Sequence, residues 1–138
     1  MKKLVIIGAN DFQNQLILKA KSLGYETHVF AWEEGAVGKS TADYFYPISI
    51  VEKEEILDKC KQIKPDGVCS IASDLASITV NYVAENLGLP CNKMKYSAIQ
   101  TNKYKMREAF MAAGLPCPKF VLADENFDES QVKDFKFP

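Results

Sequence analysis

This sequence has little histidine, no closely spaced pair of cysteines and no excess of positive or negative charge. Its 138 residues include one histidine, His28, and four cysteines, no two of which form a C-x-x-C pair. Zinc sites need clustered cysteine and histidine ligands, and disulfide frameworks need an ordered set of cysteines. We therefore predict no metal centre and no disulfide. Reduced thiols of this kind are typical of a cytoplasmic protein.

The balance of charge excludes two classes of partner. Lysine and arginine number 17 against 18 acidic residues, which gives a formal net charge of -1. Proteins that bind nucleic acid or anionic membranes usually carry a clear positive excess. The apolar run of residues 4–7 stops at Gly8, which is too early for an export signal. The sequence predicts small molecules or proteins as partners, with no nucleic acid and no membrane.

Strand and helix patterns alternate along the first 90 residues. Apolar runs rich in β-branched or aromatic residues predict strands at residues 3–7, 26–32, 44–50 and 68–71. Apolar residues at helical spacing predict helices at residues 12–23, 52–63 and 76–87. Strands that alternate with helices build a parallel sheet. The sequence thus predicts an α/β fold, a Rossmann-like parallel-sheet layer sandwich.

Helical spacing also predicts which side chains face the core. The inward positions of the three helices are, in chain order, Phe12, Leu16, Ala20 and Leu23, then Ile56, Leu57, Cys60 and Ile63, then Ala76, Val80, Val83, Ala84 and Leu87.

After Cys91 the pattern changes. Residues 97–100 predict a short helical turn, and a helix capped by Thr101 or Asn102 follows as far as Ala113. Its predicted buried stripe is Met106, Ala109, Phe110 and Ala113. We predict one domain over residues 1–122, and a linker or the start of another domain over residues 123–138.

The segment from Gly8 to Gln13 follows a strand and opens a helix, as the dinucleotide fingerprint does. Only Gly8 matches the G-x-G-x-x-G pattern, because Asn10 and Gln13 stand where glycines are needed. NAD and FAD are therefore not predicted. The Gly38-Lys39-Ser40 run lacks the spacing of a P-loop.

Polar residues gather where two of the predicted strands end. Gly8, Asn10 and Gln15 follow the first strand, and Ser73 and Asp74 follow the fourth. Loops at the carboxyl ends of strands surround the ligands of open α/β sheets. We predict that these five residues bind a small polar substrate. Helix capping and turn formation are the alternative interpretation of the same residues.

Lys103 lies in the first turn of the last predicted helix, where the helix dipole disfavours a cation. Such a placement suggests an anionic ligand. Arg107 follows one turn later on the same face. The alternative is that both cations are solvated.

Several short segments, in the order in which they occur, resemble those of a known family. The segments are residues 4–8 with the polar loop after them, 42–43, 66–68, 73–74, 87–90, 101–108 and 113–118. In this order they resemble the N-terminal domain of ATP-grasp ligases of the carbamoyl-phosphate-synthase-like group, which is called the pre-ATP-grasp domain. Asn102 departs from the family pattern, which has an aspartate at that position.

The resemblance implies a function. These ligases activate a carboxylate as an acyl phosphate and pass it to an amine, with ATP and magnesium as cofactors of the complete enzyme. The resemblance implies that Lys103, supported by Arg107, contacts ATP, and that the loops after the strands shape the site of a small-molecule carboxylate or amine. The remaining domains of the ligase would be the partners of this chain.

The resemblance also implies more chain than is present. In the family, a hydrophobic-Pro segment such as Phe137-Pro138 is followed by a strand with an ATP-contacting lysine, a Gly-rich loop and acidic metal ligands. We expect the 138 residues alone to bind no cofactor and to catalyse no ligation, whether they are part of a longer enzyme or a subunit of a split one. The alternative is a non-enzymatic, flavodoxin-like ligand-binding or regulatory module.

Overall fold

A computed structural model describes residues 1–136 of the protein. Packing divides the chain into two compact units, Met1–Ser97 and Ala98–Pro138. The predicted domain boundary after residue 122 stays a prediction. The Phe137-Pro138 pair, which resembles the family's hydrophobic-Pro segment, lies outside the described residues.

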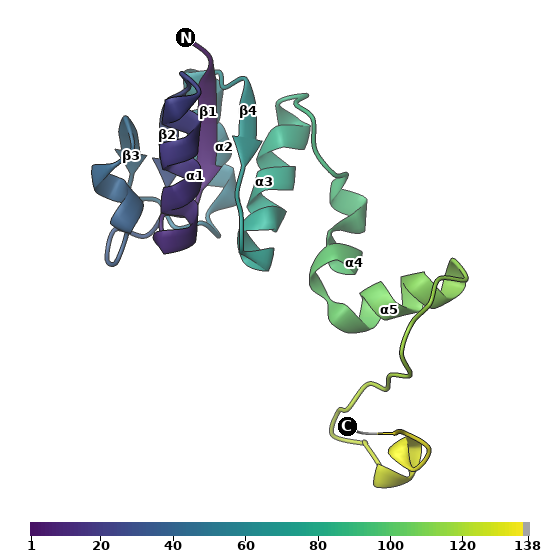
Figure 1. The fold of residues 1–138 in the computed structure, drawn as a ribbon. Coiled ribbons are helices and arrows are strands. Elements are labelled where there is room, and N and C mark those ends of the chain that lie inside the picture. The colour runs from purple at the N-terminus through teal and green to yellow at the C-terminus, as the bar shows by residue number, and fades with distance from the viewer. Residues whose placement is uncertain (137–138) are drawn as a thin grey trace. The chain divides into compact units, whose positions relative to one another are not determined.

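The first unit is built on a four-stranded sheet (Figure 1). Its strands are β1 (Lys3–Ile7), β2 (Glu26–Phe30), β3 (Tyr44–Tyr46) and β4 (Gly67–Cys69). They are all parallel and lie in the order β3-β2-β1-β4. The predicted parallel α/β sheet is confirmed, although β2, β3 and β4 end earlier than the apolar runs indicated.

Helices cover both faces of this sheet. They are α1 (Asp11–Ser22), α2 (Lys53–Ile63) and α3 (Asp74–Asn86). Alternate side chains of β1 point to opposite faces, as the period of a strand requires. Ile6 packs with α1, whereas Val5 and Ile7 pack with α2 and α3. The continuous apolar run of β1 is therefore explained by a strand that is buried on both faces.

The inward face of α1 differs from the prediction. Phe12 and Leu23 are 65% and 61% exposed, while Gln13, Ile17 and Ala20 are buried. These three residues keep helical spacing, but the stripe begins with a polar side chain. The prediction is therefore confirmed for Ala20, and Leu16 is partly buried, whereas Phe12 and Leu23 were wrongly placed inward. The inward residues predicted for α2 are all buried, and in α3 Ala76, Val83 and Ala84 are buried.

The second unit contains a short helix α4 (Ser97–Thr101), a longer helix α5 (Lys103–Ala112) and a 3-10 turn at Glu129–Val132. Asn102 caps α5, because its side-chain oxygen accepts a hydrogen bond from the Lys105 amide at 3.0 Å. The predicted buried stripe of this helix is wrong. No residue of α5 is buried within the described chain, and Phe110 is 38% exposed. Tyr104 makes an edge contact with Phe120 at 5.3 Å between ring centroids.

Asp43 ties α1, β2 and the start of β3 together. Its carboxylate accepts hydrogen bonds from the Thr27 amide at 2.9 Å and from the Thr27 hydroxyl at 2.8 Å. The Lys21 ammonium donates to the other oxygen at 2.6 Å. The contact with Lys21, followed by those with Thr27, lowers the pKa of the Asp43 carboxyl from 3.8 to about 2.

We expect the Asp43 network to make stability depend on pH. A carboxyl whose pKa is depressed by folding contributes above its unfolded pKa and loses that contribution as pH falls through the folded pKa. Because the carboxylate is partly solvated, we expect about 1 kcal/mol. Urea unfolding of the wild type and of Asp43→Asn should differ by this amount near neutral pH. The difference should shrink between pH values of about 4 and about 2; a difference that is constant with pH would contradict the assignment.

Candidate functional site

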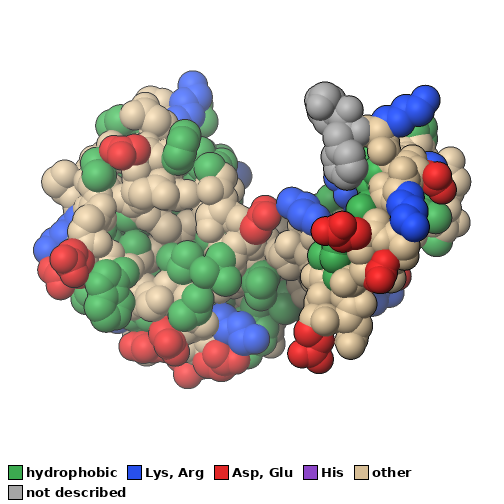
Figure 2. Space-filling model, turned by 90° about the horizontal axis from the view of Figure 1, so that it is seen from below, with side chains coloured by type: hydrophobic (Ala, Val, Ile, Leu, Met, Phe, Trp, Pro, Cys, Tyr) green, Lys and Arg blue, Asp and Glu red, His purple; other side chains and the backbone are tan. Residues whose placement is uncertain are grey.

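The four strands end at one edge of the sheet, and polar loops follow them there. The loop after β1 carries Asn10, which caps α1, and the loop after β4 carries Ser73, which caps α3. Because β1 and β4 are parallel neighbours, both helix starts lie at this edge. Figure 2, a view from below Figure 1, shows acidic and exposed hydrophobic side chains on this face of the molecule.

A cavity of about 210 Å³ lies at this edge and is lined by all four of these loops. Residues 8–10 and Gln13 contribute from the first loop and the start of α1, and residues 31–32 and 34–36 contribute from the loop after β2. Ser49 and Ile50 contribute from the segment after β3. Ser73 and Ala76 complete the lining. The cavity thus lies where the sequence predicted that polar residues gather, after the first and fourth strands.

Gln13 is the residue that organises the cavity, and the sequence analysis missed it. Its side-chain oxygen accepts from the Asn10 amide at 3.1 Å, and its amide nitrogen donates to the Ile71 carbonyl in the loop before α3. Asn10 accepts in return from the amides of Phe12 and Gln13. This reciprocal capping box is visible in sequence as a polar cap followed three residues later by Gln. Gln13 thus links the loop after β1 to the loop after β4.

Gly8 is required by the same arrangement. Its φ of +99° lies in the region that favours glycine. A Cβ at this position would lie 3.1 Å from the Cδ of Gln13. The loop is also fixed from outside, because the Gly38 amide donates to the Ala9 carbonyl at 2.8 Å and the Ser70 hydroxyl donates to the Ile7 carbonyl at 2.6 Å. The backbone of the cavity wall is therefore held by hydrogen bonds from two neighbouring segments.

The structure does not bring all five predicted substrate residues together. Gly8, Asn10 and Ser73 line the cavity. Gln15 is exposed on α1, and Asp74 is exposed at the start of α3; neither is among the residues that line the cavity. Gln15 lies two residues beyond Gln13, so on a helix the two side chains point in different directions. The role of all five residues in binding stays a prediction.

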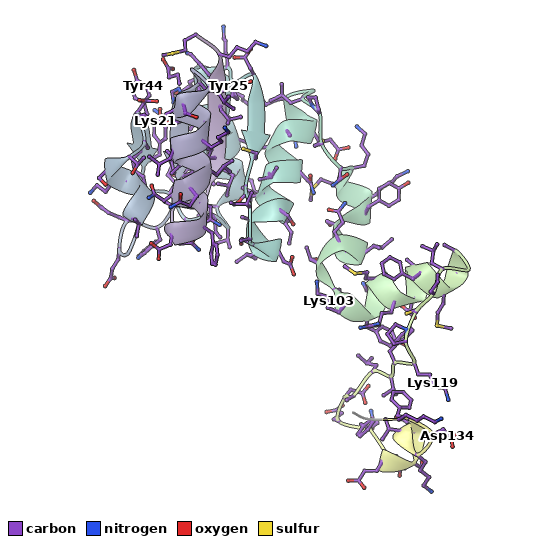
Figure 3. All side chains as sticks on the ribbon, in the orientation of Figure 1. Lys21, Tyr25, Tyr44, Lys103, Lys119 and Asp134 are labelled. Atoms are coloured by element: carbon purple, nitrogen blue, oxygen red, sulfur yellow. The ribbon has the colours of Figure 1, made fainter. Side chains whose placement is uncertain are left out.

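Lys103 and Arg107 lie in the second unit. Lys103 is the first residue of α5, as predicted, and is exposed to solvent (Figure 3). Arg107 is half-buried, with its Nη1 atom 3.8 Å from the Cys117 sulfur. A larger cavity of about 880 Å³ lies beside α5, lined by residues that include Tyr104, Lys119 and Phe120 but neither Lys103 nor Arg107. Their contact with ATP stays a prediction.

Cys60, Cys69 and His28 show no sign of an activated side chain, and the described residues hold no metal centre. Burial raises the pKa of the Cys60 thiol to about 12 and that of the Cys69 thiol to about 11, so both stay protonated. His28 is buried between Glu26 and Tyr46, at 2.7 Å and 3.0 Å, as expected for a structural histidine. Residues 1–136 contain no group of three His, Cys, Asp or Glu side chains able to hold a metal. Every helix in that range is too short or too polar to cross a membrane.

Several known proteins resemble this chain in sequence or in fold. No family model matches the chain. Over 67 residues, the chain is 30% identical to a formate-dependent phosphoribosylglycinamide formyltransferase of Prochlorococcus marinus strain MIT 9515. That match covers 49% of this chain and 17% of the relative.

Solved structures match over the whole chain. A phosphoribosylglycinamide synthetase from Anaerococcus prevotii is 25% identical with a TM-score of 0.77, over 99% of this chain and 35% of the synthetase. An N5-carboxyaminoimidazole ribonucleotide synthetase from Thermotoga maritima is 24% identical with a TM-score of 0.78, over 100% and 37%. An L-amino acid ligase from Bacillus licheniformis is 22% identical with a TM-score of 0.71, over 100% and 36%.

The chain therefore spans about a third of the length of these solved structures. The matching fold is a parallel sheet with helices on both faces, with a ligand-sized cavity at the end of its strands. In its fold, the chain matches the N-terminal, pre-ATP-grasp domains of ATP-grasp ligases.

Proposed function

We propose that this chain is the substrate-side domain of an ATP-dependent ligase that joins a carboxylate to an amine. The single observation that supports this most is the match to the Anaerococcus synthetase along 99% of the chain. The cavity adds to it, because it lies at the carboxyl ends of parallel strands, where α/β proteins bind their ligands. The matched proteins are named as two synthetases, an L-amino acid ligase and a formate-dependent formyltransferase.

The proposed reaction has two steps. A carboxylate oxygen of the substrate attacks the γ-phosphorus of ATP, and ADP leaves with the electrons of the broken phosphorus–oxygen bond. The amine then attacks the acyl carbon, and inorganic phosphate leaves with the former carboxylate oxygen while the amine loses a proton. In this scheme the described chain binds and orients one substrate in the cavity that Asn10 and Ser73 line, so that the reacting groups meet at close range.

The residues of this chain fit the two cofactors to different extents. Magnesium needs clustered oxygen ligands, and residues 1–136 do not hold such a cluster. We therefore assign the ion no site in this chain. Lys103 is an exposed cation at a helix start, and an ammonium of this kind can form charge-assisted hydrogen bonds with a phosphate of ATP. ATP would supply the phosphoryl group that activates the carboxylate.

We expect the isolated 138-residue chain to show no ligase activity and only weak binding of Mg-ATP. Micromolar affinity corresponds to about 8 kcal/mol, whereas a charged hydrogen bond supplies about 1.5–3 kcal/mol, so Lys103 and its neighbours cannot provide it alone. Calorimetric titration of the chain with Mg-ATP measures this directly. A micromolar dissociation constant would contradict our assignment of the nucleotide site to other parts of the ligase.

The proposal itself is tested on the longest polypeptide encoded by the reading frame that contains this chain. Hydroxylamine traps acyl phosphates as hydroxamates, so the polypeptide should form a hydroxamate and ADP from ATP and one member of a panel of formate, bicarbonate and amino acids. With ¹⁸O-labelled carboxylate, the released phosphate should carry one labelled oxygen when the amine is the acceptor. Release of ADP without hydroxamate, and without transfer of ¹⁸O to phosphate, would contradict the acyl-phosphate mechanism. No nucleotide turnover at all would favour a flavodoxin-like ligand-binding module.

A further inference from the structure

The cavity at the end of the strands has an unusual balance of charge for a site that would hold a phosphorylated substrate. Among its lining residues Glu34 is the only charged one, and no lysine or arginine is present. At the start of α1, two of the amides are already used, because Asn10 accepts hydrogen bonds from Phe12 and Gln13. At the start of α3, the Ser73 hydroxyl oxygen likewise accepts from the Ala76 amide. Phosphate sites rely on such amides or on basic side chains.

Glu34 and its neighbour Glu33 differ in their partners. Glu33 pairs with Lys39 at 2.5 Å, outside the cavity lining. The Glu34 carboxylate has no hydrogen-bond or ion-pair partner among residues 1–136 that the structure describes, and it lines the cavity. A carboxylate in this position is able to accept hydrogen bonds from a cationic ligand without first breaking an internal ion pair.

Trp32 supplies the second half of a cation site. It lines the same cavity two residues before Glu34. The residue is 67% exposed, a large exposed fraction for a tryptophan. The face of an indole ring attracts ammonium groups, and Trp is the best of the aromatic residues in this respect. An aromatic face and an unpaired carboxylate in one cavity together select a positive charge.

The size of the cavity limits the ligand. Its volume of about 210 Å³ holds roughly seven water-sized groups at ~30 Å³ each. Pockets for larger organic ligands are typically about 300–1,000 Å³. The cavity therefore suits a small amine, and its charge does not suit a ribose phosphate.

We propose that Trp32 and Glu34 bind the ammonium group of a small, unphosphorylated primary amine in this cavity. Glu34 pairs with the ammonium and Trp32 packs against it. In its link to catalysis the inference rests on the proposed function, because the bound amine is then the acceptor of the ligase. It also separates this chain from the matched enzymes whose names specify phosphoribosyl or ribonucleotide substrates.

Intrinsic fluorescence tests the proposal on the 138-residue chain, because Trp32 is its only tryptophan. The probe is glycinamide, which is cationic near neutral pH, and acetamide serves as its analogue without the ammonium group. We expect a saturable fluorescence change with glycinamide, at a dissociation constant in the millimolar range, and none with acetamide. Ribose 5-phosphate should not compete.

Two glutamine variants form the matched pair. Glu34→Gln should weaken glycinamide binding by about tenfold or more, because it removes the charge that pairs with the ammonium. Glu33→Gln removes the same charge one residue away and should leave the dissociation constant unchanged. Equal effects of the two variants, saturation by acetamide or ribose 5-phosphate, or no saturation by glycinamide would each overturn the cation site. None of these results affects hydroxamate formation by the longer polypeptide, so the ligase proposal is tested separately.

Discussion

Replacing Phe30 with alanine is expected to lower the free energy of unfolding by about 3–5 kcal/mol, the usual cost of deleting a buried phenylalanine. Phe30 is the last residue of β2 and is fully buried. Its ring stacks on Tyr46 at 4.6 Å between centroids and belongs to the core shared with α2 and α3. A small domain has a net stability of only about 5–15 kcal/mol. The loss is therefore a large fraction of the stability that a domain of this size has.

Urea unfolding followed by circular dichroism measures this effect. Phe12→Ala is the matched control, because Phe12 is 65% exposed on α1, and we expect a change within about 0.5 kcal/mol. If both variants lost similar stability, the described orientation of α1 and of the β2 core would be wrong. The comparison also distinguishes the two faces of α1, since the sequence alone had placed Phe12 inward.

The strand and helix order was predictable because most of its signals are local. The β-branched run before Gly8 and the stripe from Ile56 to Ile63 each belong to one element, and each was found in sequence. The inward face of α1 was not, because Gln13 is buried by hydrogen bonds to Asn10 and to Ile71, which is 58 residues away. A contact of this kind depends on the tertiary fold.

The exposed stripe of α5 was not predictable for a related reason. Met106 and Phe110 keep helical spacing, which normally indicates a buried face. Spacing shows that a helix is amphipathic, but it does not show what covers the apolar side. In the described chain that side is not buried.

The candidate site was predictable in its position and not in its chemistry. Asn10 and Ser73 follow from the strand order, because parallel strands end at one edge. Trp32 and Glu34 were missed because the apolar run predicted that β2 would continue to Trp32. The strand ends at Phe30, so both residues belong to the loop that lines the cavity. The prediction made β2 two residues too long, and this error placed Trp32 in the sheet instead of in the loop that lines the cavity.

Replacing Lys103 with alanine in the complete ligase is expected to raise the Michaelis constant for ATP roughly ten- to hundredfold. This corresponds to losing one charge-assisted contact with a phosphate, which is worth about 1.5–3 kcal/mol. Lys103 is the first residue of α5, where the positive end of the helix dipole opposes a cation. Its removal should therefore leave the fold as stable as before or slightly more stable.

Steady-state kinetics with varied ATP, together with a melting curve, separate binding from folding. Lys105→Ala is the control, because Lys105 lies two residues later on another face of α5 and is also exposed. It should leave the Michaelis constant for ATP unchanged. If Lys103→Ala behaved like Lys105→Ala while both proteins stayed folded, Lys103 would be a solvated lysine. The contact with ATP that the family pattern around Asn102 implies would then not exist in the proposed ligase.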